Sequence, residues 1–241
     1  MDEPDSKCPR ACSRSGVSVR TNPRSPEFSK THSSDEVRIP VFITNERGAP
    51  ITGATSAQLS VSEDRNTATS FDLRPAEGVP LYIGVLIDSS NSEEKIRDIA
   101  VQTLGMFLNH VMTTAADRAF ISTFSTTMKP AIWMGKSEIS EYQPHIQVGG
   151  GTALYDAVGQ AATLEGQTPL ARRVLVLVTD GEDNLSHLTH EEATAQAQKA
   201  GIVIFSVSTN GTEPATRGER KLKQFAEATG DSHCSPIKQS R

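Results

Sequence analysis

The sequence predicts an α/β fold: a doubly wound, mostly parallel sheet flanked by helices, preceded by a small β segment and a disordered N-terminal tail. Three continuous apolar runs, at 81–87, 174–178 and 202–207, are typical of strands buried on both faces. Between these runs, apolar residues recur at spacings of three and four, as on one face of a helix. Strands that alternate with helices favour a parallel sheet that is covered on both sides.

Composition divides the 241-residue chain into four segments. The first is rich in serine, proline and charged residues, so it buries too little apolar surface to become ordered. The last is polar, contains a proline and shows no helical period. The predicted segments are a disordered tail at 1–36, a small β module at 37–78, the α/β domain at 79–230 and a loose C-terminal tail at 231–241.

The small β module is predicted to contain three short strands and no helix. β-Branched residues alternate in 37–44, and shorter candidate strands follow at 57–63 and 69–73. The residues from Asn45 to Gly48 are typical of a turn after the first strand. Three short strands form a marginal sheet, so we expect the module to pack on the domain that follows.

The α/β domain is predicted to alternate strand and helix from its first buried strand onward. Glycines close its last two helices, at Gly201 and Gly230. Strands are expected at 81–87, 118–124, 174–178 and 202–207, with a short edge strand at 132–134. Helices are expected at 96–111, 152–164, 190–199 and 217–229.

Charge and composition exclude several functional classes. The formal net charge of −5 argues against general nucleic-acid binding. No apolar run approaches the ~18 residues that a membrane span needs, and the N-terminal segment lacks the apolar region of a signal peptide. Cys8, Cys12 and Cys234 have neither disulfide-scaffold nor zinc-site spacing. The residues alone leave the cellular location unknown.

Polar side chains gather where the predicted strands end. Asp88, Ser90 and Ser92 follow the first buried strand, Thr152 follows three glycines at the start of a helix, and Asp180 follows the strand at 174–178. In this architecture ligands bind beyond the carboxyl ends of the strands. All five side chains offer oxygen, the ligand that hard cations such as Mg²⁺ prefer. The sequence therefore predicts a divalent metal site there.

This pattern resembles the von Willebrand factor A domain, the fold of integrin I domains. The metal-ion-dependent adhesion site (MIDAS) of that family is read as Asp-x-Ser-x-Ser, then Thr, then Asp. The matching residues are Asp88, Ser90 and Ser92, then Thr152, then Asp180. The resemblance covers roughly 80–230. The stretch from Gly48 to Gly53 is similar to the leader of bacterial VWFA-related proteins.

The resemblance implies a metal-dependent adhesion or protein-interaction module with a Rossmann-like sheet and no chemistry of its own. In the family the serines and threonine bind Mg²⁺, or Mn²⁺ or Ca²⁺, directly, and the aspartates often bind it through water. An acidic side chain of a protein partner completes the metal shell. Asp156, Gly151 and Gly181 are candidate supporting residues behind the ligands. An extracellular or periplasmic location is expected from the resemblance.

Two alternatives stand beside a working adhesion site. Family members carry one more strand and a final helix, which we expect to be missing from 231–241, so a degenerate scaffold that binds no metal is one alternative. A Mg²⁺-dependent hydrolase or phosphotransferase is the other. Such an enzyme requires a second aspartate two residues after Asp88, but Ser90 stands there. It also requires a lysine next to the three loops, and the sequence has none there. We therefore predict that the protein is not an enzyme.

Overall fold

The computed structural model divides by its backbone contacts into two compact units. One comprises Met1–Pro23 and Ile43–Arg74, and the other comprises Arg24–Phe42 and Pro75–Arg241. The residues that the structure describes are 17–20, 41, 43, 45, 51–63, 66–68, 70–76, 78–90, 97–142, 146, 148–168, 171–210 and 216–230.

The smaller unit contains a three-stranded sheet. Its central strand, β2 (Leu59–Glu63), pairs in parallel with β1 (Val17–Arg20) and antiparallel with β3 (Asn66–Thr67). A short 3₁₀ turn, η1 (Ser56–Gln58), precedes β2. Of the tail predicted to be disordered at 1–36, the structure describes only Val17–Arg20, and the rest lies outside the described residues. The strand β1 was not predicted, because its hydrogen bonds come from a strand some forty residues later, which composition does not reveal.

Of the other strands predicted for this unit, one is confirmed and one is wrong. The strand expected at 57–63 is confirmed from Leu59 onward. The strand expected at 69–73 is wrong, because the pairing with β2 is made earlier, by Asn66 and Thr67. Most of 37–44 lies outside the described residues, and the C=O of Ile43 accepts a hydrogen bond from the N–H of Ile51 at 2.8 Å.

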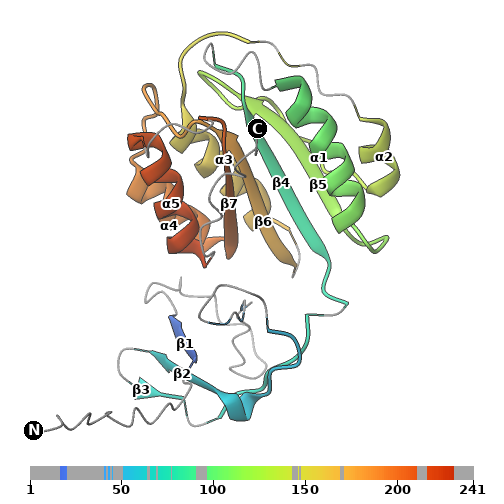
Figure 1. Cartoon of the computed structure of the whole chain (residues 1–241), viewed down its shortest axis with the longest axis vertical. Helices are drawn as coiled ribbons and strands as arrows, with labels where there is room; N and C mark the ends of the chain where they lie inside the picture. Colours follow the sequence, from blue (N-terminus) through green and yellow to red (C-terminus); the bar gives the residue numbers. More distant parts are fainter. Residues whose placement is uncertain are drawn as a thin grey trace, which may run out of the picture. The chain divides into compact units, whose positions relative to one another are not determined.

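The larger unit contains the predicted α/β sheet. Four parallel strands lie in the order β5-β4-β6-β7, and helices cover both faces (Figure 1). The strands are β4 (Leu81–Asp88), β5 (Arg118–Phe124), β6 (Arg172–Thr179) and β7 (Ile202–Ser208). The helices are α1 (Arg97–Val111), α2 (Lys136–Glu141), α3 (Leu154–Gly166), α4 (His190–Lys199) and α5 (Arg217–Thr229).

Alternate side chains of the strands build two separate apolar layers. Leu86 and Phe120 point to the face covered by α3, α4 and α5, where Phe225 of α5 is fully buried. Val85 and Ile121 point to the opposite face, where Leu108 of α1 packs. Figure 1 shows the same division, with α1 and α2 on one side of the sheet and α3, α4 and α5 on the other. Burial on both faces explains the continuous apolar runs of these strands.

The edge beside β5 departs from the prediction. Only Met134 of the expected strand at 132–134 pairs, through an antiparallel bridge to Ala119. Trp133 instead packs edge-on against Tyr82 and Phe120, with ring centroids 5.0 and 4.8 Å away. Helix α2 was not predicted, because in a polar six-residue segment only Ile139 is buried.

Local capping fixes the ends of the last two helices. The Thr189 hydroxyl accepts a hydrogen bond from Glu192 N–H at the start of α4, and the Thr216 hydroxyl does the same for Glu219 at the start of α5. Gly230 ends α5 with φ 105°, a left-handed conformation that favours glycine. Within the described part of the chain, every helix is too short or too polar to cross a membrane. The predicted tail at 231–241 lies outside the described residues.

Candidate metal centre

Four of the five predicted ligands lie at the carboxyl-terminal edge of the larger sheet. Asp88 ends β4, and Ser90 follows it by two residues. Asp180 follows directly after β6, the strand paired with β4, and Thr152 stands two residues before α3. The fifth, Ser92, lies outside the described residues. Sheet topology therefore brings together polar groups that are some ninety positions apart in the sequence.

Asp88 is buried and held from two sides, with only 2% of its surface exposed. Its Oδ1 accepts a hydrogen bond from Ser90 N–H at 2.9 Å, and its Oδ2 accepts one from the Thr179 hydroxyl at 2.7 Å. The Thr179 hydroxyl oxygen in turn accepts from Gly181 N–H at 3.1 Å. This relay fixes the Asp88 carboxylate relative to the loop that carries Asp180.

The charge on Asp88 is poorly compensated. Burial raises the pKa of its carboxyl above the ordinary value, and the nearby negative charge of Asp180 raises it further. Hydrogen bonds from Ser90 and Thr179 lower the pKa but offset only part of the rise. Two carboxylates whose charges interact at the edge of a sheet repel, and a bound cation would remove that repulsion.

Backbone hydrogen bonds fasten the Thr152 loop to its neighbours. Thr152 N–H donates to Asn184 Oδ1 at 2.9 Å, and Thr152 C=O accepts from the N–H groups of Asn184 and Leu185 at 2.9 and 3.0 Å. Gly149 N–H donates to Ser89 C=O at 3.0 Å on the other side. The three loops that carry the candidate ligands are thus bonded to one another.

Two of the predicted supporting residues are glycine for steric reasons. A Cβ on Gly151 would lie 2.6 Å from Asn184 Oδ1 and 2.7 Å from Leu185 Cδ1. Gly181 has φ 81°, and its Cβ would lie 2.5 Å from the carbonyl oxygen of Gly218. Side chains at either position would push the Thr152 and Asp180 loops out of place.

Asp156, the third supporting candidate, holds the loop beyond Asp180. Its carboxylate accepts hydrogen bonds from the N–H groups of His187 and Leu188, and its Oδ2 lies 2.9 Å from His187 Nδ1. Burial alone would raise the pKa of Asp156, but these hydrogen bonds outweigh it and lower the pKa below its ordinary value. Asp156 therefore stays charged and orders 187–188.

Sequence reasoning missed the groups that join these loops. Thr179 and Asn184 flank the Asp180 motif, but the sequence does not reveal which carboxylate or backbone group each one meets. The hydroxyl of Ser89, between the candidate ligands Asp88 and Ser90, donates to Phe124 C=O at 2.9 Å. One feature of the sequence could have indicated these bonds. Hydroxyl and amide side chains beside a strand end, such as those of Thr179 and Asn184, commonly form hydrogen bonds to neighbouring backbone.

The donor chemistry suits a hard cation. The described candidate ligands are two carboxylates and two hydroxyls, and oxygen ligands of this kind suit Mg²⁺, Mn²⁺ and Ca²⁺. Within the described ranges, no cluster of three or more His, Cys, Asp or Glu side chains forms a metal site of another type. The residues present therefore fit a divalent cation of the type predicted from the sequence.

Comparison with known proteins gives the family. The family model described as von Willebrand factor type A domain matches 83–240. The chain belongs to the von Willebrand factor type A (VWA) domain family. VWA domains commonly serve in adhesion and protein interaction. Among proteins of curated function, none matches this sequence.

Solved structures resemble this chain at low sequence identity. BatB from Bacteroides thetaiotaomicron is 15% identical with TM-score 0.45, over 64% of this chain and 91% of that one. The D319A mutant of the PilB minor pilin from Streptococcus sanguinis is 11% identical with TM-score 0.50, over 73% and 62%. A von Willebrand factor type A protein from Catenulispora acidiphila is 15% identical with TM-score 0.39, over 63% and 43%. At these identities the likeness concerns the fold alone.

Proposed function

We propose that this VWA domain is a protein-interaction module that holds a divalent cation, Mg²⁺ in the first instance, and through it binds an acidic side chain of a partner. The observation that supports the proposal is that Asp88 and Asp180 follow neighbouring strands of the sheet, close enough for their negative charges to interact. Ser90 and Thr152 stand in the loops that are bonded to them. Ser92 is the proposed fifth ligand.

The proposed ligands leave room for a partner, because Mg²⁺ takes six oxygen ligands and the chain supplies five. Two carboxylates balance the charge of a divalent cation, while the hydroxyls add coordination but no negative charge. A cation held in this way keeps affinity for a further oxygen ligand. A glutamate or aspartate of a partner protein supplies such an oxygen together with a negative charge, so recognition depends on the metal.

The same arrangement supports a role without catalysis. The groups around the site are hydroxyls and carboxylates that bond to backbone and to each other. The two described histidines with side-chain partners contact Asp156 and Lys221 C=O instead. With Ser90 at the position where a phosphotransferase would place its second acid, the site offers binding groups rather than an acid–base pair.

The test is a thermal melt of the full chain in Mg²⁺, in Mn²⁺ and in EDTA. A cation that binds only the folded state, at ten times its Kd, adds about 1.4 kcal/mol of stability. For a chain of this size that raises the Tm by roughly 3–6 °C. We expect this rise in the wild type and its loss in Asp88→Asn and Asp180→Asn, which keep side-chain shape but remove one charge.

Glu227→Gln is the matched control, because it neutralises an exposed carboxylate on α5 whose ion-pair partner is Lys223. This variant should keep the full response to metal. Cooperative melting of the wild type with the same Tm in all three solutions, together with no heat of Mg²⁺ binding by calorimetry, would contradict the proposal and leave a VWA scaffold without a working site.

A further inference from the structure

The loop that carries Asp180 rests directly on the first turn of α5. Gly218, the second residue of this helix, is buried, and a Cβ placed on it would lie 2.3 Å from the carbonyl oxygen of Asp180. The same Cβ would lie 2.8 Å from the carbonyl carbon of Gly181. Backbone meets backbone here with no side chain between, so the loop cannot keep its place if the helix end moves or gains a methyl group.

Three hydrogen bonds connect the same two segments, two of them through Asn210. Asn210 Nδ2 donates to Asp180 C=O at 3.1 Å and lies 3.3 Å from the Thr216 hydroxyl that caps α5. Gly218 N–H donates to Glu182 Oε1 at 3.2 Å. The N–H of Glu182 donates to Asp180 Oδ1 at 2.9 Å, so one residue bonds both the helix end and the carboxylate.

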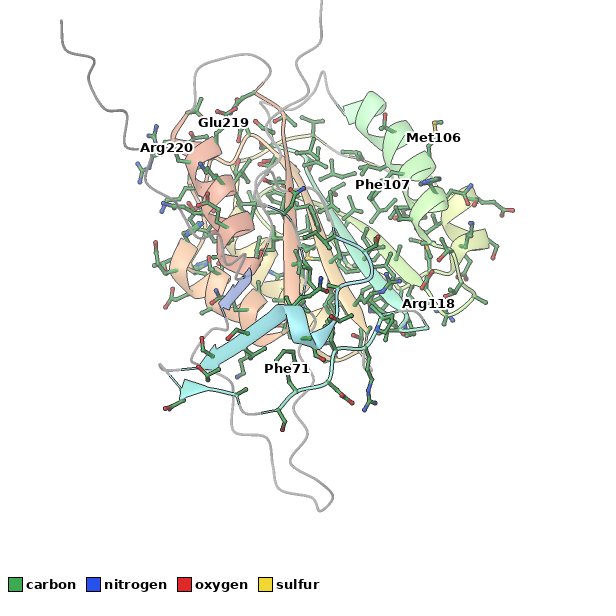
Figure 2. All side chains as sticks on the ribbon, turned by 60° about the horizontal axis from the view of Figure 1, so that its bottom comes forward. Phe71, Met106, Phe107, Arg118, Glu219 and Arg220 are labelled. Atoms are coloured by element: carbon green, nitrogen blue, oxygen red, sulfur yellow. The ribbon has the colours of Figure 1, made fainter. Side chains whose placement is uncertain are left out.

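We propose that the first turn of α5 is the positioning element for Asp180, with Gly218 as the residue that permits the required approach. This inference rests on the proposed metal site. It adds that α5 sets the position of one of the two metal-binding carboxylates, that of Asp180. Glu219 and Arg220, labelled in Figure 2, mark this turn of α5. Further along α5, Leu222 and Phe225 are buried in the core. The loop therefore rests on a helix that the core holds in place.

Gly218→Ala separates this role from helix stability. Gly218 lies within α5, where alanine favours the helix over glycine by about 1 kcal/mol. Local propensity thus predicts a better helix, whereas the contact with Asp180 predicts a displaced loop. Gly105→Ala is the matched control, because a Cβ added to this glycine of α1 would meet nothing within 4 Å.

The first measurement needs no metal. Hydrogen exchange of the full chain in EDTA should show faster exchange at the amides of Gly181 and Glu182 in Gly218→Ala, with unchanged exchange in β4 and β6. Asn210→Ala, which removes the two side-chain hydrogen bonds of Asn210 without adding bulk, should have the same effect to a smaller extent. It keeps the test valid if Gly218→Ala does not fold. Gly105→Ala should exchange like the wild type.

The second measurement is a Mg²⁺ titration by calorimetry. Loss of a residue that orients a metal ligand typically weakens binding by roughly ten- to a hundredfold, and we expect that loss in Gly218→Ala with none in Gly105→Ala. Wild-type Mg²⁺ affinity and exchange in both Gly218→Ala and Asn210→Ala would overturn the positioning role and leave the metal site standing. A wild type that binds no Mg²⁺ would overturn the metal site, and exchange alone would then show whether α5 still holds the loop.

Discussion

Glu165 is a carboxylic acid enclosed in an apolar interior. It lies in the last turn of α3 with none of its surface exposed, and neither carboxyl oxygen has a hydrogen-bond partner of good geometry among the described residues. Burial therefore raises its pKa well above the ordinary value, and the positive charge of Arg173 and the nearby backbone N–H of Gly84 offset only part of that rise. The folded state consequently favours the protonated acid.

The pH dependence of stability follows from that direction. Because the pKa of Glu165 is higher in the folded than in the unfolded state, its stability cost is absent below the ordinary pKa and grows as pH rises toward the raised value. Glu165→Gln should gain stability relative to the wild type with rising pH, by about 1–3 kcal/mol at the alkaline end. Urea unfolding at several pH values checks this, and parallel pH curves for the two proteins would contradict it.

At the scale of elements, side chains of β5 and α3 lie so close to β4 that position 84 of this strand must be glycine. A Cβ on Gly84 of β4 would lie 2.4 Å from Phe120 Cζ and 2.6 Å from Glu165 Oε1. Phe120 is itself fully buried and wedged against Trp133, so it has little room to give way. Glycine weakens a strand interior, and close packing of this kind is the usual reason for its presence.

Gly84→Ala is expected to destabilise the larger unit by about 1–3 kcal/mol, the usual cost of overpacking a core. The measurement is chemical unfolding followed by circular dichroism. Gly84→Ala combined with Phe120→Leu should recover part of the loss, because the smaller side chain leaves room for the added methyl group. Equal stability of wild type and Gly84→Ala would show that the core adjusts at no cost.

Sequence reasoning succeeded for the elements whose evidence is local. Buried strands and amphipathic helices repeat their apolar residues at short spacing, so β4, α4 and α5 could be placed to within a residue or so. It failed for β1 and β3, whose existence depends on pairing with β2. The candidate site divides in the same way. Its ligands stand at strand ends visible in the sequence, whereas the bond from Thr179 to Asp88 exists only after β4 and β6 pair.

At the scale of the whole molecule, the two units should respond separately to perturbation. All described strands of the parallel sheet and both of its apolar layers begin at or after Leu81. The chain has a single tryptophan, and Trp133 contacts Tyr82 and Phe120 in that sheet. Its fluorescence therefore reports on the larger unit.

Deletion of 1–23, which removes β1 from the smaller sheet, should leave the unfolding midpoint seen by Trp133 unchanged. The reason is that sites in separate compact units usually contribute independently to stability. Denaturant unfolding of the full and shortened chains, followed by fluorescence, makes the comparison. A lower Trp133 midpoint in the shortened chain would mean that the smaller unit supports the larger one, as the marginal size of the β module led us to expect from sequence alone.

The strand order has a consequence for synthesis on the ribosome. β4 lies between β5 and β6, yet β6 is made some eighty residues after β4. Until β6 has been made, β4 can pair with β5 on one side only, and its other edge exposes unpaired backbone beside apolar side chains. Such an edge favours misassembly between nascent chains. We expect the emerging protein to need shielding until β6 has left the exit tunnel, and only then can Asp88 and Asp180 meet.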